Sequence, residues 1–136
     1  MKPAEMLKRT ALFAEMSDAD ISELALSTRI ENYKPGRIIV REGHVGAALF
    51  ILMSGKVEVV RGIAGGEETV VGTLGAGDFF GEVAVMKHVA RSASARALET
   101  TECLVIRRLD LESFIDRYPG IDAKVETALS RRFDEH

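Results

Sequence analysis

The chain has 136 residues, of which 46% are hydrophobic and 29% charged, and its formal net charge is −3. This composition suits one core, and we expect residues 1–136 to form a single domain. A negative net charge argues against a general nucleic-acid surface, because that mode of binding depends on clustered positive charge. No apolar run approaches the roughly 18 residues of a membrane span and no signal peptide is recognisable, so we expect a cytoplasmic protein without a membrane span.

The first predicted element is an amphipathic helix over residues 18–30. Ser17 precedes it in the position of an N-cap. Apolar side chains then recur at helical spacing, at Ile21, Leu24 and Ala25. We therefore assign residues 1–35 to an N-terminal helical segment.

The middle of the chain is rich in turns, since eleven of the twelve glycines lie between Gly36 and Gly81. Gly65 and Gly66 mark a hairpin tip, because consecutive glycines permit the positive φ angles of tight hairpins. Short runs that contain many β-branched residues are separated by such breakers. These runs cover residues 37–41, 48–53, 56–61, 68–73, 94–98 and 102–108. The pattern predicts a small antiparallel barrel or sandwich over residues 36–108.

A second helical region is predicted to begin at Leu109. Tyr118, Pro119 and Gly120 interrupt it, and the helical pattern resumes over residues 121–133. Residues 109–136 therefore predict a hinge followed by a final helix. The chain contains no internal repeat and no low-complexity linker.

A candidate anion site lies within residues 77–95. Gly81 opens a predicted helical turn, where backbone N–H groups and the helix dipole attract a phosphate. Arg91 adds a planar cation that can bind two phosphate oxygens together. Glu82 would be repelled by a phosphate, but as an acceptor it suits a ribose hydroxyl. One segment is thus predicted to bind both parts of a sugar phosphate.

These residues carry a family resemblance. Residues 80–84 and 91–93 resemble the phosphate-binding cassette of cyclic nucleotide-binding domains, and residues 35–43 and 49–59 resemble the first strands of the family's β-roll. The likeness covers roughly residues 8–133. The family usually has a glycine and then a proline just before the arginine, where this chain has residues 87–90 instead.

The resemblance implies an α+β fold. Its centre would be an antiparallel β-roll, a jelly-roll-like barrel at residues 36–108 that includes the cassette at residues 77–95. The N-terminal helical segment, a short cassette helix and C-terminal helices would complete the domain.

The resemblance also implies a set of binding residues. Glu82 would contact the ribose 2′-hydroxyl, and Arg91 and Ser92 the cyclic phosphate. The complete predicted set is Gly81, Glu82, Val83, Arg91, Ser92, Ala93 and Arg132.

Arg132 enters this set through its spacing from Arg91 and Pro119, which is similar to that of prokaryotic cyclic-nucleotide-gated potassium channels. In those channels an arginine of the last helix reaches the purine. The alternative is that Arg132 only complements the negative end of a terminal helix.

Other side chains have simpler interpretations. We expect Phe79 and Phe80 both to pack in the core, although alternate strand residues face opposite sides. Cys103 lies in a β-rich run and is interpreted as a small buried hydrophobe, since one cysteine cannot form an internal disulfide. The three histidines are scattered without a His-x-His pair, so no metal site is predicted.

These features distinguish among three function classes. The leading hypothesis is a non-catalytic receptor for cyclic AMP, with cyclic GMP as the other ligand, and with an effector that the sequence does not identify. The second is the sensor half of a transcription regulator or channel whose output domain is absent from this chain. The third, a metal oxygenase of the cupin kind, is disfavoured by the histidine pattern. No nucleophile–base pair indicates phosphodiester hydrolysis.

Overall fold

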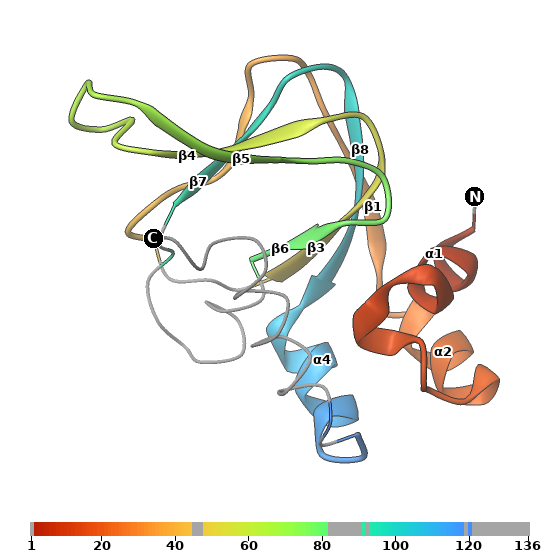
Figure 1. The fold of residues 1–136 in the computed structure, drawn as a ribbon. Coiled ribbons are helices and arrows are strands. Elements are labelled where there is room, and N and C mark those ends of the chain that lie inside the picture. The colour runs from red at the N-terminus through yellow and green to blue at the C-terminus, as the bar shows by residue number, and fades with distance from the viewer. Residues whose placement is uncertain (1, 45–47, 82–90, 92, 119, 121–136) are drawn as a thin grey trace.

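The structure is a computed structural model that describes residues 2–44, 48–81, 91, 93–118 and 120. In this part of the chain the strands form two four-stranded antiparallel sheets, ordered β1-β8-β3-β6 and β2-β7-β4-β5 (Figure 1). The strands are β1 (Arg29–Tyr33), β2 (Ile38–Val40), β3 (Ala48–Ser54), β4 (Val57–Arg61), β5 (Thr69–Leu74), β6 (Phe79–Phe80), β7 (Ser94–Ala97) and β8 (Thr101–Arg107). The helices are α1 (Pro3–Arg9), the 3-10 turn η1 (Ala11–Phe13), α2 (Asp18–Ala25) and α4 (Arg108–Ile115).

Two apolar clusters divide the interior. One lies between the two sheets, and the other lies where the helices cover the outer face of the β1-β8-β3-β6 sheet (Figure 1). Strand β3 shows the division, because Phe50 and Leu52 belong to the inner cluster whereas Leu49 and Ile51 belong to the helical one. A strand covered on both faces needs apolar residues without alternation, which explains its nearly continuous apolar sequence.

The six predicted β-rich runs are confirmed as strands β2, β3, β4, β5, β7 and β8. The predicted hairpin tip is also confirmed, since Gly66 has a φ of +81° between β4 and β5. Gly62 at the end of β4 has a φ of +85°. Strands β1 and β6 were not predicted, because β1 lies in the segment that was assigned to helix and β6 has only two residues.

The predicted helix 18–30 is too long. Its start is confirmed, since the Ser17 hydroxyl accepts a hydrogen bond from the Asp20 N–H at 3.1 Å. The helix ends at Ala25, whose carbonyl accepts a bond from the Thr28 hydroxyl at 2.7 Å. Residues 29–33 then pair with β8 as strand β1, so the segment 1–35 is not helical throughout. Strand pairing outweighs a local helical pattern here.

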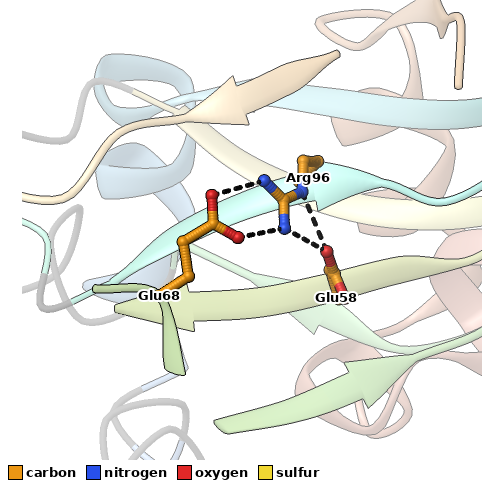
Figure 2. Close-up of polar contacts among 3 residues, drawn as sticks. All are labelled: Glu58, Glu68 and Arg96. Atoms are coloured by element: carbon orange, nitrogen blue, oxygen red, sulfur yellow. Dashed lines mark hydrogen bonds and ion pairs between the residues drawn. The ribbon is translucent and has the colours of Figure 1, made fainter. Parts of the chain in front are cut away.

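An ion cluster on the outer face of the β2-β7-β4-β5 sheet joins β7 to β4 and to the residue just before β5 (Figure 2). Arg96 of β7 donates to Glu58 of β4 through Nε at 2.8 Å and Nη2 at 2.6 Å. It also donates to Glu68, just before β5, through Nη1 at 3.0 Å and Nη2 at 2.8 Å. These bonds lower the pKa of Glu68 below its ordinary value and raise that of Arg96. The cluster fixes the hairpin to β7.

The predicted C-terminal helix is confirmed as α4, which begins at Arg108. Its end is fastened to α2, because Nη1 of Arg117 lies 2.9 Å from Oδ1 of Asp20 and the Tyr118 hydroxyl donates to Oδ2. Tyr118, the first of the predicted hinge residues, is therefore held against α2. The helix predicted over residues 121–133 lies outside the described residues.

Candidate functional site

Gly81 and Arg91 meet at the end of β6. The backbone φ of Gly81 is +87°, in the left-handed region that glycine adopts without strain. A Cβ on residue 81 would lie 2.6 Å from Nη1 of Arg91 and 3.0 Å from the carbonyl oxygen of Ala48. Only glycine lets the guanidinium approach the main chain here. Residues ten apart in sequence are thus brought into contact as the predicted anion site requires.

The Arg91 side chain is oriented by β3. Its Nη2 donates to the carbonyl oxygen of Ala48 at 3.2 Å, and its guanidinium carbon lies 5.8 Å from the centre of the Phe50 ring. The Phe50 ring in turn stacks on Phe80, with centroids 5.0 Å apart and planes 6° apart. A charge-assisted bond and an aromatic face together hold the arginine in one orientation.

The backbone of Arg91 is held by the turn that follows β2. Its N–H donates to the carbonyl of His44 at 2.9 Å, and its carbonyl accepts from the Gly43 N–H at 2.8 Å. The same turn reaches β7, since the Glu42 N–H donates to the Ser94 hydroxyl at 2.9 Å. Glu42 also accepts from the Gly62 N–H at 3.0 Å. One turn therefore joins Arg91, β7 and the end of β4.

Sequence reasoning missed these supporting residues. Ala48 acts through its carbonyl and leaves no side-chain signal, and Glu42 looks like any solvated loop carboxylate. Gly43 offers the one local signal, because its φ of +87° requires a glycine in that turn.

The packing predicted for the two phenylalanines is confirmed. Phe79 belongs to the helical cluster and Phe80 to the inner cluster, and both are buried. They face opposite sides of the sheet, as strand geometry demands.

Of the other predicted binding residues, Ala93 packs against the inner cluster directly before β7. Glu82, Val83, Ser92 and Arg132 lie outside the described residues. Their roles stay predictions.

The described residues contain no alternative reactive centre that the geometry supports. Cys103 is fully buried, as predicted, and burial raises the pKa of its thiol to about 12, which keeps it protonated. In this part of the chain no three His, Cys, Asp or Glu side chains gather as metal ligands would. None of the described helices has the length and apolar character needed to cross a bilayer.

Comparison with known proteins agrees with this geometry. Residues 30–118 match the family model for the cyclic nucleotide-binding domain. The chain is 36% identical over 130 residues to the cyclic AMP receptor protein of Thermus thermophilus, covering 95% of this chain and 60% of that protein. It is 38% identical over 116 residues to a cGMP-dependent protein kinase of Toxoplasma gondii, covering 85% of this chain and 11% of the kinase.

The crystal structure of the Thermus thermophilus catabolite activator protein superposes with a TM-score of 0.77 at 34% identity, covering 91% of this chain and 58% of that one. The chain thus spans three fifths or less of the length of these relatives. The family model covers most of the chain, and the residue pair that brings a glycine against an arginine lies inside the matched range. The chain belongs to the cyclic nucleotide-binding domain family.

Proposed function

We propose that this chain binds a cyclic nucleotide, cyclic AMP or cyclic GMP, and reports its presence without transforming it. The observation that carries the proposal is the approach of the Arg91 guanidinium to the Cα of Gly81. Backbone N–H groups beside a fixed, planar cation suit the singly charged phosphate of a cyclic nucleotide. The names of the two sequence relatives include cyclic AMP and cGMP, which supports the same ligand class.

The binding set of the proposal is the one predicted from the sequence. Gly81, Val83, Arg91, Ser92 and Ala93 would surround the phosphate, and Glu82 would accept from the ribose 2′-hydroxyl. Arg132 would approach the purine from the final helix. The roles proposed for these residues are to bind and orient the ligand, so the proposed function is non-catalytic.

The output of the receptor is proposed as a movement of the C-terminal segment. The effector is either another part of a longer chain, such as the DNA-binding part of a regulator or a channel pore, or a separate protein.

Calorimetric titration tests the proposal. Wild-type protein is titrated with cyclic AMP, cyclic GMP, 5′-AMP and 5′-GMP, and we expect saturable binding of at least one cyclic nucleotide and much weaker binding of the linear ones. Product analysis after long incubation should return the cyclic nucleotide unchanged. Absence of binding to either cyclic nucleotide by folded protein would refute the proposal.

Replacement of Arg91 assigns the phosphate contact. Hydrogen bonds to charged groups contribute roughly 1.5–3 kcal/mol each, so Arg91→Ala should weaken binding at least about tenfold. Arg91→Lys should also be impaired, because it keeps the charge and loses the planar fork. Arg9→Ala, which removes an exposed arginine from α1, is the matched control. An Arg91→Ala protein that folds and binds as tightly as this control would show that the ligand lies elsewhere.

A further inference from the structure

Glu42 lies in the turn that follows β2, and its backbone and side chain bond to two different strands. Its N–H donates to the hydroxyl of Ser94, the first residue of β7, at 2.9 Å. Its carboxylate accepts from the N–H of Gly62 at 3.0 Å, and Gly62 directly follows β4. One residue thus connects this turn to β7 and to the base of the β4–β5 hairpin.

Gly62 gives the Glu42 carboxylate a partner whose position is fixed. The φ of Gly62 is +85°, and a Cβ added to this residue would collide with the carbonyl of Glu67 across the hairpin. The close approach of the two hairpin segments therefore sets the position of the Gly62 N–H. Within the described residues the acceptor of this N–H is the Glu42 side chain.

A cavity lies beside this bond, between the turn and the hairpin. Its volume is about 220 Å³, and its lining includes Glu42, Ile63, Ala64 and Ser94. A cavity lacks the packed atoms that transmit a displacement from one segment to another. The carboxylate–amide bond therefore carries more of the connection between turn and hairpin than it would beside a filled contact.

The next two residues of the turn hold the main chain of Arg91. The Gly43 N–H donates to the Arg91 carbonyl at 2.8 Å, and the His44 carbonyl accepts from the Arg91 N–H at 2.9 Å. The guanidinium has little room to adjust, because it lies against Gly81 and bonds to the Ala48 carbonyl at 3.2 Å. A shift of the turn would therefore misplace the guanidinium relative to a bound phosphate.

We propose that Glu42 is a positioning residue whose carboxylate couples the base of the β4–β5 hairpin to the Arg91 guanidinium. This inference rests on the proposed function and adds a means of regulating the same site. A displacement at Gly62 would reach Arg91 through the turn, so the conformation of the hairpin sets the affinity for the cyclic phosphate. Glu42 acts through Arg91 and is not a ligand contact.

Replacement of Glu42 tests the first step, by calorimetric titration with cyclic AMP and cyclic GMP. Glu42→Ala should weaken binding about threefold to tenfold, the range for loss of one exposed hydrogen bond. Glu42→Gln should retain most of the affinity, because its amide oxygen still accepts from Gly62. Glu67→Ala removes an exposed carboxylate from the same hairpin, so it is the charge-matched control and should bind as wild type does.

Displacement of the hairpin tests the coupling without altering the turn. Gly62→Ala should weaken ligand binding, because its methyl group collides with the Glu67 carbonyl and moves the N–H that Glu42 holds. Gly66→Ala is the matched control, since Gly66 has a φ of +81° in the same hairpin with nothing within 4 Å of the added Cβ. In the Glu42→Ala background, Gly62→Ala should cause no further loss of affinity, because the connection is already broken.

A double-mutant cycle with Arg91→Ala separates positioning from a general loss of structure. If Glu42 acts through the guanidinium, Glu42→Ala should change the affinity by less than about twofold in the Arg91→Ala background. An equal loss in both backgrounds would overturn the inference. If Arg91→Ala binds too weakly to titrate, the cycle of Glu42→Ala with Gly62→Ala decides the matter.

The other outcomes separate the inference from the proposed function. Failure of folded wild type to bind either cyclic nucleotide refutes the proposed function. If wild type binds, equal affinities of Glu42→Ala and Glu67→Ala overturn the inference, as do equal affinities of Gly62→Ala and Gly66→Ala. Thermal melts check folding, and the comparison of Glu42→Ala with Glu42→Gln decides the matter if Gly62→Ala does not fold.

Discussion

At the scale of single residues, the site depends on a glycine that makes room for an arginine. Gly81 combines a left-handed backbone with a close contact that any side chain at this position would disturb, because an added Cβ would lie 2.6 Å from Nη1 of Arg91. Arg91 is oriented by one carbonyl and one aromatic ring, neither of which is near it in sequence. The room left by Gly81 depends on short-range repulsion, and the orientation of Arg91 depends on directional bonding. Small changes at residue 81 should therefore have large effects on binding.

We expect Gly81→Ala to abolish most cyclic nucleotide binding. A methyl group 2.6 Å from Nη1 would displace the guanidinium, and the positive φ would add about 1 to 2 kcal/mol of backbone strain. Gly36→Ala is the matched control, because Gly36 has the same φ of +87° with nothing within 4 Å of the added Cβ. Urea denaturation should show a loss of stability in both variants, and calorimetry a loss of affinity in Gly81→Ala alone. Equal affinities of the two variants would mean that the close contact has no part in binding.

Glu82 is expected to recognise the ribose. Wild type should prefer cyclic AMP to 2′-deoxy cyclic AMP, because removing the hydroxyl leaves a desolvated carboxylate without its donor. Glu82→Ala should erase most of that preference, measured as the ratio of the two dissociation constants. If the mutation weakens both ligands by the same factor, Glu82 is structural instead.

At the scale of elements, polar clusters rather than loop sequences join parts of the chain that are distant in sequence. The Arg96 cluster attaches the β4–β5 hairpin to β7, and the turn after β2 connects β7 to the end of β4 through Glu42. A third cluster, at Asp20, attaches the first turn of α2 to the end of α4, directly before the predicted hinge. Because Asp20 bonds as a carboxylate, this last attachment should make the stability of the fold depend on pH.

The pKa of Asp20 is lowered below 3.8, chiefly by the Tyr118 hydroxyl bond and further by Ser17 and Arg117. A folded-state pKa below the unfolded one stabilises the fold above the unfolded value and ceases to do so as pH falls through the folded one. Asp20→Asn should therefore be less stable than wild type at neutral pH, and the difference should shrink below about pH 4.

Urea denaturation at a series of pH values measures this difference. Asp18→Asn is the control, because Asp18 lies in the same helical turn with a side chain that is 93% exposed. A stability difference between wild type and Asp20→Asn that persists unchanged to pH 2 would contradict the assigned role of the carboxylate.

At the scale of the whole molecule, a receptor needs a contact that differs between its ligand-bound and ligand-free states. The β-roll alone would bind without reporting. The described helices cover the outer face of the β1-β8-β3-β6 sheet, and α4 leads into the predicted hinge at residues 118–120 (Figure 1).

We expect residues 121–136 to act as a lid. Cyclic AMP should increase the protection of this segment from hydrogen exchange, and Arg132→Ala should mainly raise the dissociation rate while weakening binding less than Arg91→Ala. Deleting residues 121–136 should have a stronger effect of the same kind and leave the β-roll folded. Unchanged protection on addition of ligand would leave Arg132 as a charge at a helix end.

Much of this architecture could be predicted from the sequence because its causes are local. Short runs, many of them rich in β-branched residues, specify six of the strands, Gly66 marks the hairpin, and Ser17 caps α2. The candidate site could be located because Gly81 and Arg91 each suit a phosphate by their own chemistry. Strand β1 could not be predicted, since its conformation depends on pairing with β8, about seventy residues away in the chain.

The sequence by itself thus determined the family, the order of the β-rich runs and the residue types that the candidate site requires. The end of α2, and the carbonyl and the ring that orient Arg91, depend instead on the tertiary structure. The physical reason is range. Propensity, capping and turn geometry act over a few residues, whereas strand pairing, burial and contacts to carbonyl oxygens depend on which distant segments the fold brings together.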